Sequence, residues 1–213
     1  TAEMPGLYPQ GSYDLAGFCV GAAERGTLLS RETPQAGDIV FALASSGIHS
    51  NGFSLVRKII SRDQLDYPEP APFASHMNLG EALIAPTRIY TDAVAAALSC
   101  GGVTGVAHIT GGGLIENPPR IYTDSLQMRL DIRKHHIPPD FRCLKEKGGL
   151  SDFELARTFN CGIGMLISVT PDKAESVMSA IQLTGEDIWQ AGYICERSGH
   201  DAIILEHCET VWA

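Results

Sequence analysis

The chain has 213 residues, enough for one substantial core, and its formal net charge of −9 argues against a nucleic-acid partner, because phosphate backbones are held by clustered Lys and Arg. Hydrophobic residues make up 44% of the sequence, and no apolar run approaches the roughly 20 residues that span a bilayer. A small anionic ligand remains compatible with this composition, since a few backbone N–H groups and one or two arginines can hold a phosphate.

The cysteines indicate a reducing environment. Six of them are scattered along the chain without a CxxC pair. Cys19 and Cys161 lie inside apolar runs, where a reduced thiol behaves as a small hydrophobic side chain. We therefore interpret the cysteines as structural residues of a cytoplasmic protein. Because Thr1 lies within what reads as a structured motif, we also expect the chain to be a fragment or a processed product.

Apolar patterning and turn residues predict alternating strands and helices. In chain order these are a buried strand at 13–23, a connection at 24–37, a strand at 38–44, an amphipathic helix from 53 to about 61, a surface loop at 63–78, a helix at 88–100, a strand at 102–109, a short helix broken at 118–119, a half-exposed strand at 125–132, short helices at 141–147 and 153–157, a buried strand at 161–169, a helix capped by Thr170 that ends near 185, and strands at 187–195 and 202–208. This alternation, with paired strands at its end, predicts an α+β fold with a mixed β-sheet and helices packed on it.

The segment SSGIHSNGFSLVRK, residues 45–58, predicts a turn of small polar residues between a strand and a helix. Small side chains let a ligand approach the backbone, and the first N–H groups of a helix can bind an anion. His49 could donate a hydrogen bond to a phosphate oxygen or relay a proton. The alternative is an ordinary helix start, capped by Ser50 or Asn51, with His49 on the surface. The spacing matches neither the P-loop nor the dinucleotide-binding pattern.

Three consecutive glycines, Gly111 to Gly113, follow a predicted strand in the segment AHITGGGLIEN. Such a run costs chain entropy and packs no side chain, so it usually indicates that the backbone approaches something closely. His108 and Thr110 frame the loop, and Asn117 lies one helical turn further on. The alternative is a plain glycine turn. Because both segments share a strand–loop–helix design, the two loops together could hold two parts of one anionic ligand.

A third candidate is APTRIYTD, residues 85–92. Thr87 can cap the predicted helix, and Arg88 sits at its start. A cation there opposes the helix dipole, which is reasonable if Arg88 faces an anion. The alternative is an arginine that faces solvent. The seven histidines form no HxxxH or HExxH pattern, so the sequence does not predict a protein-only zinc site, and the metal ligands stay unknown.

Four segments in register resemble the aminoimidazole ribonucleotide (AIR) synthetase family, the phosphoribosylformylglycinamidine cyclo-ligases. They are SSGIHSNGFSLVRK, APTRIYTDAV, AHITGGGLIENPPR and RTFNCGIGM, and the opening TAEMPGLY and YDLAGFCVG resemble the same family. The resemblance implies the C-terminal half of a ligase of de novo purine biosynthesis. That ligase cyclises formylglycinamidine ribonucleotide to AIR, with ATP and Mg²⁺ as cofactors and with ADP and phosphate released.

The resemblance also implies where the substrate binds. It places the two loops at a cleft between two domains, with His49 and His108 as the catalytic residues that hydrogen-bond the substrate phosphate or the reacting amide. The expected substrate- and phosphate-binding residues are Ser50, Asn51, Gly52, Thr87, Arg88, Thr110, Gly111, Gly112, Gly113 and Asn117.

The family further implies two domains and a homodimer formed mainly through the N-terminal one. Residues 1–30 would be the tail of the N-terminal ATP-binding domain, including its last strand, and residues 31–213 the C-terminal domain. The ligands of ATP and Mg²⁺ are expected mostly in the upstream half. The isolated chain is therefore expected to be inactive or nearly so.

Other ATP-using enzymes share this architecture, namely formylglycinamidine ribonucleotide synthetase, selenophosphate synthetase and thiamine-monophosphate kinase. The HSNG and HITGGG segments favour the cyclo-ligase over these enzymes. A different class is a non-catalytic domain that binds a nucleotide-like phosphate without turning over ATP.

Overall fold

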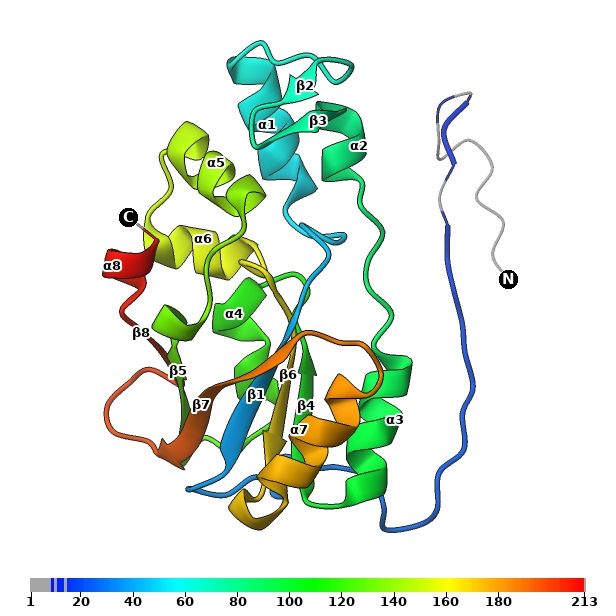
Figure 1. Cartoon of the computed structure of the whole chain (residues 1–213), viewed down its shortest axis with the longest axis vertical. Coiled ribbons are helices and arrows are strands. Elements are labelled where there is room, and N and C mark those ends of the chain that lie inside the picture. Colours follow the sequence, from blue (N-terminus) through cyan, green and yellow to red (C-terminus); the bar gives the residue numbers. More distant parts are fainter. Residues whose placement is uncertain (1–8, 10, 14, 213) are drawn as a thin grey trace.

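A six-stranded mixed sheet forms the centre of the protein (Figure 1). The computed structural model describes residues 9, 11–13 and 15–212. In the order in which they lie in the sheet, the strands are β4 Val103–His108, β6 Ile163–Val169, β1 Ile39–Ala44, β7 Ile188–Glu196, β5 Leu126–Asp131 and β8 Ile203–Glu206. Neighbouring strands are antiparallel except β5 and β8, which run parallel. The predicted α+β fold with a mixed sheet is therefore confirmed.

Helices cover both faces of this sheet (Figure 1). Helices α3 (Thr91–Cys100) and α7 (Ala174–Gln182) pack on one face. On the other face lie α1 Phe53–Arg62, α4 Gly113–Glu116, α5 Pro139–Gly148 and α6 Asp152–Thr158. The remaining elements are α2 Leu79–Leu83, α8 Cys208–Val211, the 3-10 turns η1 Pro118–Arg120, η2 Ile132–Lys134 and η3 Pro171–Lys173, and the hairpin strands β2 Pro70–Ala71 and β3 Ala74–Asn78.

The central strand β1 sends alternate side chains into two separate hydrophobic cores. Val40 and Ala42 belong to the core that includes α1, α5 and α6, whereas Phe41 and Leu43 belong to the core under α3 and α7. Successive side chains of a strand point to opposite faces, so a strand covered on both faces must be apolar throughout. This explains why the run IVFALA, and the fully buried β6, are recognisable as strands in the sequence.

The region predicted as a surface loop at 63–78 contains regular structure. Strands β2 and β3 form a hairpin, and Asn78 then caps α2 through a capping box with Glu81. Pro70 lies in the two-residue strand β2 at the edge of this hairpin, a place where proline is tolerated because no further strand needs its missing N–H. The loop prediction was wrong here because a short edge strand carries almost no periodic signal.

Three smaller corrections concern element boundaries and burial. Helix α3 begins at Thr91 with Tyr90 at its N-cap, so Thr87 does not cap it. The helix predicted from Thr170 is a 3-10 turn, η3, followed by α7, and the Thr170 side chain makes no capping hydrogen bond. Strand β5 is mostly buried rather than half exposed, because its second face is also covered: Gln127 is buried and donates to the carbonyl oxygen of Asp201, and Arg129 is partly buried in its pair with Glu206.

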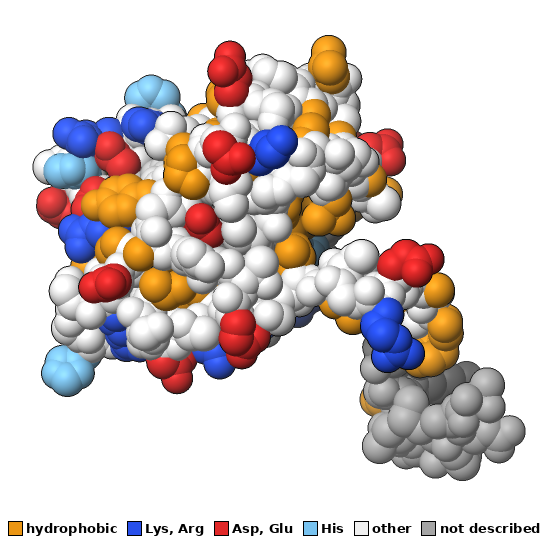
Figure 2. Space-filling view, turned by 90° about the horizontal axis from the view of Figure 1, so that it is seen from below, with side chains coloured by type: hydrophobic (Ala, Val, Ile, Leu, Met, Phe, Trp, Pro, Cys, Tyr) orange, Lys and Arg blue, Asp and Glu red, His pale blue; other side chains and the backbone are white. Residues whose placement is uncertain are grey.

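The buried strand predicted at 13–23 is not formed. The described residues of this stretch are exposed and belong to no strand; the side chains of Phe18 and Val20 are 93% and 85% exposed, and Cys19 is exposed as well. Figure 2 shows the segment projecting from the body with apolar side chains on its surface. A strand needs a partner edge for its backbone groups, and no strand of the described chain pairs with it. The opening TAEMPGLY lies outside the described residues.

Candidate functional site

The two predicted loops come together at one edge of the sheet. Strand β6 lies between β1 and β4 and is antiparallel to both, so β1 and β4 point the same way and their C-terminal ends share an edge. The rings of His49 and His108 are 6.5 Å apart between centroids. A Cβ placed on Gly111 would lie 3.9 Å from the Oδ1 atom of Asn51. The juxtaposition of the two loops is therefore a property of the sheet topology.

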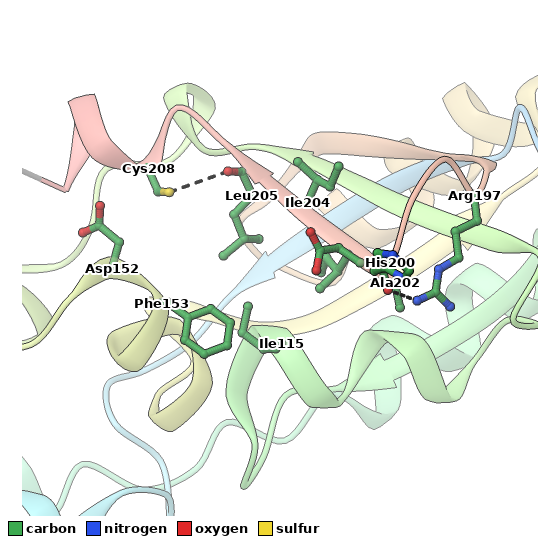
Figure 3. A pocket seen from close by; sticks show the side chains of 11 residues that line it. Ile115, Asp152, Phe153, Arg197, His200, Ala202, Ile204, Leu205 and Cys208 are labelled. Carbon is green, nitrogen blue, oxygen red and sulfur yellow. Dashed lines mark hydrogen bonds between the residues drawn. The ribbon is translucent and has the colours of Figure 1, made fainter.

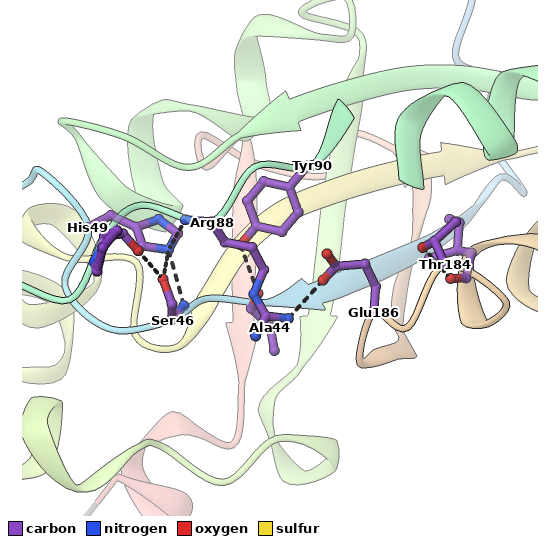
Figure 4. Close-up of polar contacts among 9 residues, drawn as sticks. Ala44, Ser46, His49, Arg88, Tyr90, Thr184 and Glu186 are labelled. Carbon is purple, nitrogen blue, oxygen red and sulfur yellow. Dashed lines mark hydrogen bonds and ion pairs between the residues drawn. The ribbon is translucent and has the colours of Figure 1, made fainter. Parts of the chain in front are cut away.

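His49 is buried beneath its own loop rather than on the surface, with 4% of the residue exposed. Two backbone N–H groups point at its Nε2 atom, that of Ser46 at 3.1 Å and that of Arg88 at 3.5 Å (Figure 4). Nε2 is therefore an acceptor, and the ring proton of neutral His49 resides on Nδ1. This Nδ1 atom is buried without a hydrogen-bond partner among the described residues. An unpaired buried donor is costly, which makes Nδ1–H a candidate for contact with a ligand.

The environment keeps His49 uncharged at neutral pH. Burial, with smaller contributions from the nearby His108 and Arg88, lowers the pKa of His49 from its ordinary value of 6.5 to about 4. His49 is thus suited to donate a hydrogen bond as a neutral imidazole, rather than to act as a cation.

We expect an NMR titration to show this directly. The ring signals of His49, assigned by their loss in a His49→Gln variant, should titrate with a midpoint near 4 and stay constant between pH 6 and 8. Because the unfolded chain binds this proton below about pH 6.5, stability tied to His49 should be complete above that pH and fall as the pH drops toward 4. A midpoint above 6 would contradict the buried, neutral histidine.

Asn117 and Thr110 hold the glycine loop in shape. The Asn117 amide donates to the carbonyl oxygens of Thr110 and Gly111, each at 3.2 Å, and to that of Gly113 at 2.8 Å. The Thr110 hydroxyl donates to Asn117 Oδ1 at 3.1 Å. Both side chains therefore use their hydrogen-bonding groups within the loop. They would affect ligand binding only indirectly, by fixing the position of the loop backbone.

The glycines of the two loops differ in what surrounds them. A Cβ on Gly113 would lie 2.1 Å from the carbonyl oxygen of Ala156, and one on Gly52 would lie 2.3 Å from the ring of Phe159. Gly112 has a φ of +96°, a conformation that L side chains rarely adopt. Only Gly111, of these four, combines an ordinary φ with open space next to it. Close packing within the chain therefore accounts for Gly52 and Gly113, and Gly111 is the glycine that a ligand could approach.

Arg88 faces a carboxylate of the protein itself. Its Nη1 atom lies 2.8 Å from Oε2 of Glu186, and both side chains are partly buried (Figure 4). Ser50 and Thr87 meet at 3.4 Å between their hydroxyl oxygens, so the segment 85–92 does contact the loop after β1. Any anion that binds Arg88 would share it with Glu186.

Three residues close to the loops were not predicted from the sequence. Tyr90 donates a hydrogen bond from its hydroxyl to the carbonyl oxygen of Ala44 at 2.7 Å, and its ring lies near those of His49 and His108. Burial raises the pKa of Tyr90, so it stays protonated. Glu186 pairs with Arg88, and Asn160 lies directly under the loop after β1. Tyr90 lies in the segment APTRIYTD and Asn160 in RTFNCGIGM, both recognisable in the sequence, whereas Glu186 lies in no such segment.

The cavities do not all lie at this site. One of about 600 Å³ opens between β8 and α6 and is lined by Ile115, Phe153, Arg197 and His200 among others (Figure 3), and none of the predicted site residues lines it. A second, of about 440 Å³, borders the loop residues Ser45, Ser46 and Gly47. Within the described ranges there is no group of three or more His, Cys, Asp or Glu that could hold a metal ion. Nor does any described helix have the length and apolar character to cross a membrane.

The fold matches that of two proteins of known structure. Thiamine-monophosphate kinase from Stenotrophomonas maltophilia K279a is 16% identical, with a TM-score of 0.58 over 86% of this chain and 54% of that one. The hydrogenase maturation protein HypE, determined in complex with ATP, is 17% identical, with a TM-score of 0.54 over 84% of this chain and 50% of that one. At these identities the likeness defines the fold class alone.

The sequence comparisons define the family. The model of the AIR synthase related protein, C-terminal domain, matches residues 35–204, and the chain belongs to this family. It is 46% identical over 210 residues to a phosphoribosylformylglycinamidine cyclo-ligase of Lactobacillus delbrueckii subsp. bulgaricus, covering 98% of this chain and 60% of the relative. A cyclo-ligase of Burkholderia multivorans is 50% identical over 194 residues, covering 91% of this chain and 54% of the relative. The resemblance drawn from the sequence motifs is confirmed, and the chain spans little more than half the length of these relatives.

Proposed function

We propose that this chain is the C-terminal part of a ligase that cyclises formylglycinamidine ribonucleotide to AIR in purine biosynthesis, with ATP consumed and ADP and phosphate released. The observation that carries the proposal is the identity of 46% to 50%, over nearly the whole chain, to relatives named phosphoribosylformylglycinamidine cyclo-ligase. The meeting of two small-residue loops around the unpaired Nδ1–H donor of His49 supports it.

The loops suit a substrate whose two ends must be brought together. In this reaction ATP supplies the activation of the formyl oxygen, which leaves as phosphate when the amidine nitrogen closes the ring. The Nδ1–H group of neutral His49 would donate to an oxygen of the reacting amide or of the substrate phosphate. His108 would bind the substrate from the second loop, 6.5 Å away between ring centroids. Holding both ends in position lowers the entropic part of the barrier.

The phosphate of the substrate would lie against the backbone of both loops. Ser50, Asn51 and the open side of Gly111 offer small groups there, and Thr87 and Arg88 border the first loop. The remaining predicted residues, Gly52, Thr110, Gly112, Gly113 and Asn117, would act by fixing the shape of the loops. We assign no residue to Mg²⁺, because the described acids form no suitable group, and we propose that Mg-ATP is held chiefly by the part of the relatives that this chain does not span.

We also propose a cytoplasmic homodimer built mainly through an N-terminal domain, of which residues 1–30 form the tail. The exposed apolar side chains of Phe18 and Val20 support this arrangement, because side chains of this kind are normally covered by another part of the assembly.

The test is an assay of the protein extended to its natural start. AIR formation should depend on both formylglycinamidine ribonucleotide and Mg-ATP, and the isolated 213-residue chain should form little or none. If the extended protein folds and binds ATP but forms no AIR, its function would instead be that of another ATP-using enzyme of this architecture, or of a binding domain that does not turn over ATP.

A further inference from the structure

Asn160 lies at the point where the loop after β1 meets the start of β6. Its side chain is completely buried. The Oδ1 atom accepts hydrogen bonds from the Ser45 hydroxyl at 3.0 Å and from the Gly162 N–H at 2.8 Å. The Nδ2 atom donates to the carbonyl oxygens of Gly47 at 2.9 Å and of Ile48 at 3.4 Å. The amide is therefore fully used inside the protein and has no capacity left for a ligand.

The loop that Asn160 supports has an unfavourable backbone of its own. His49 has a φ of +58°, in the left-handed region that a non-glycine residue rarely adopts, and Gly47 has a φ of +141°. Such a conformation persists only where surrounding contacts determine it. Three of the four hydrogen bonds of Asn160 reach residues just before His49, namely Ser45, Gly47 and Ile48, whereas β1 ends at Ala44.

The same loop decides which ring nitrogen of His49 carries the proton. The Ser46 N–H that points at Nε2 lies between two of the residues that Asn160 holds, Ser45 and Gly47. If this turn relaxes, the Ser46 N–H rotates away from Nε2, only the longer contact of the Arg88 N–H at 3.5 Å remains, and the preference for a proton on Nδ1 is weakened. The position of Asn160 is thereby linked to the donor that His49 presents.

We propose that Asn160 is a positioning residue, which fixes the turn from Ser45 to Ile48 and through it the tautomer and direction of the His49 ring. The catalytic consequence of this inference rests on the proposed cyclisation, whereas the structural consequence does not. Because Asn160 lies more than a hundred residues from the loop in sequence, the completed β-sheet is required to bring the two together.

The experiment compares Asn160 variants with a matched control in the full-length protein. Asn160→Asp replaces the Nδ2 donor by an oxygen that faces two carbonyl groups, and Asn160→Ala removes the amide altogether. The control is Ser168→Ala, which removes another completely buried polar group from the far part of β6, where it contacts Thr104 and Gly105. Measured for each protein are the melting temperature, kcat and KM, and the ¹⁵N signals of the His49 ring.

Both Asn160 variants should lower kcat by about 10- to 100-fold, the scale expected when a reacting group is misplaced by about 1 Å, with a smaller change in KM. The ¹⁵N signals of His49 should move from a single Nδ1–H tautomer toward a mixture. Ser168→Ala should lower the melting temperature while leaving kcat and the His49 signals unchanged. An Asn160→Ala protein with wild-type kcat and an unchanged His49 tautomer would overturn the inference. If the wild-type protein itself forms no AIR, the cyclisation fails as a function, and the ¹⁵N signals still decide the role of Asn160.

Discussion

A Gly113→Ala protein should be destabilised by about 3 kcal/mol or more, a large part of the 5–15 kcal/mol that stabilises an ordinary domain. Two effects add at this position. The φ of +56° is costly for any residue with a Cβ, and that Cβ would lie 2.1 Å from the Ala156 carbonyl oxygen and 2.6 Å from that of Phe159. Backbone oxygens cannot rotate away as a flexible side chain can, so α4 and α6 would have to separate.

The measurement is a urea or thermal unfolding curve of the full-length variant, and the melting temperature should fall by roughly 10 °C. Gly111→Ala provides the matched control from the same loop, because its φ is ordinary and its new Cβ would contact only Asn51 Oδ1, at 3.9 Å. Alanine at 111 should leave stability within about 0.5 kcal/mol of wild type and instead raise the KM for substrate. If the two alanine variants were equally stable, the close contacts around Gly113 would not limit stability, and the prediction would be wrong.

The second large effect is expected at His49, where replacement of the ring should reduce kcat/KM by about 10² to 10³, the usual cost of losing one positioned donor. Two substitutions separate the ring nitrogens. In His49→Gln the amide oxygen can occupy the place of Nε2 and still accept from the Ser46 N–H, while the Nδ1 donor is lost. In His49→Asn the amide N–H₂ lies near the place of Nδ1, while the acceptor for Ser46 is lost.

Steady-state kinetics of the full-length variants distinguish these roles. The Gln variant should keep a near-native melting temperature and show the full loss of kcat/KM, whereas the Asn variant should be less stable and retain more activity per folded molecule. His76→Ala, an exposed histidine of the β2–β3 hairpin, controls for the loss of a histidine as such. Wild-type kinetics in the Gln variant would show that Nδ1 of His49 takes no part in the reaction.

The sheet was predictable from the sequence to the extent that each strand carries its own burial pattern. The runs at 38–44 and 161–169 are apolar apart from Asp38 and Ser168, since helices cover both faces of β1 and β6, and they were located to within two residues. The hairpin β2–β3 was missed because it is short and contains Pro70. The stretch 13–23 has the composition of a strand, but composition does not supply the partner edge that a strand requires.

The candidate site was predictable where local sequence is unusual and not where it depends on contacts distant in sequence. The glycine run and the small polar turn pointed to both loops, and the topology brings them together. Two of the glycines are required for a different reason from the one expected. Gly52 leaves room for the ring of Phe159, and Gly113 leaves room for the backbone of Ala156, rather than for a ligand. The ion pair of Arg88 with Glu186 joins residues 98 positions apart in the chain, and a single sequence carries no sign of such a pairing.

The position of β1 in the sheet has a consequence for synthesis of the protein on the ribosome. Of the strands in this sheet β1 leaves the ribosome first, yet its neighbour β6 follows about 130 residues later, as the pairing of Ile39 with Val169 shows, and its other neighbour, β7, later still. At about 5–20 residues per second, an apolar strand with two open edges therefore waits for roughly 6 to 26 seconds before either edge is covered. During that interval the nascent chain is prone to aggregate and would benefit from a chaperone.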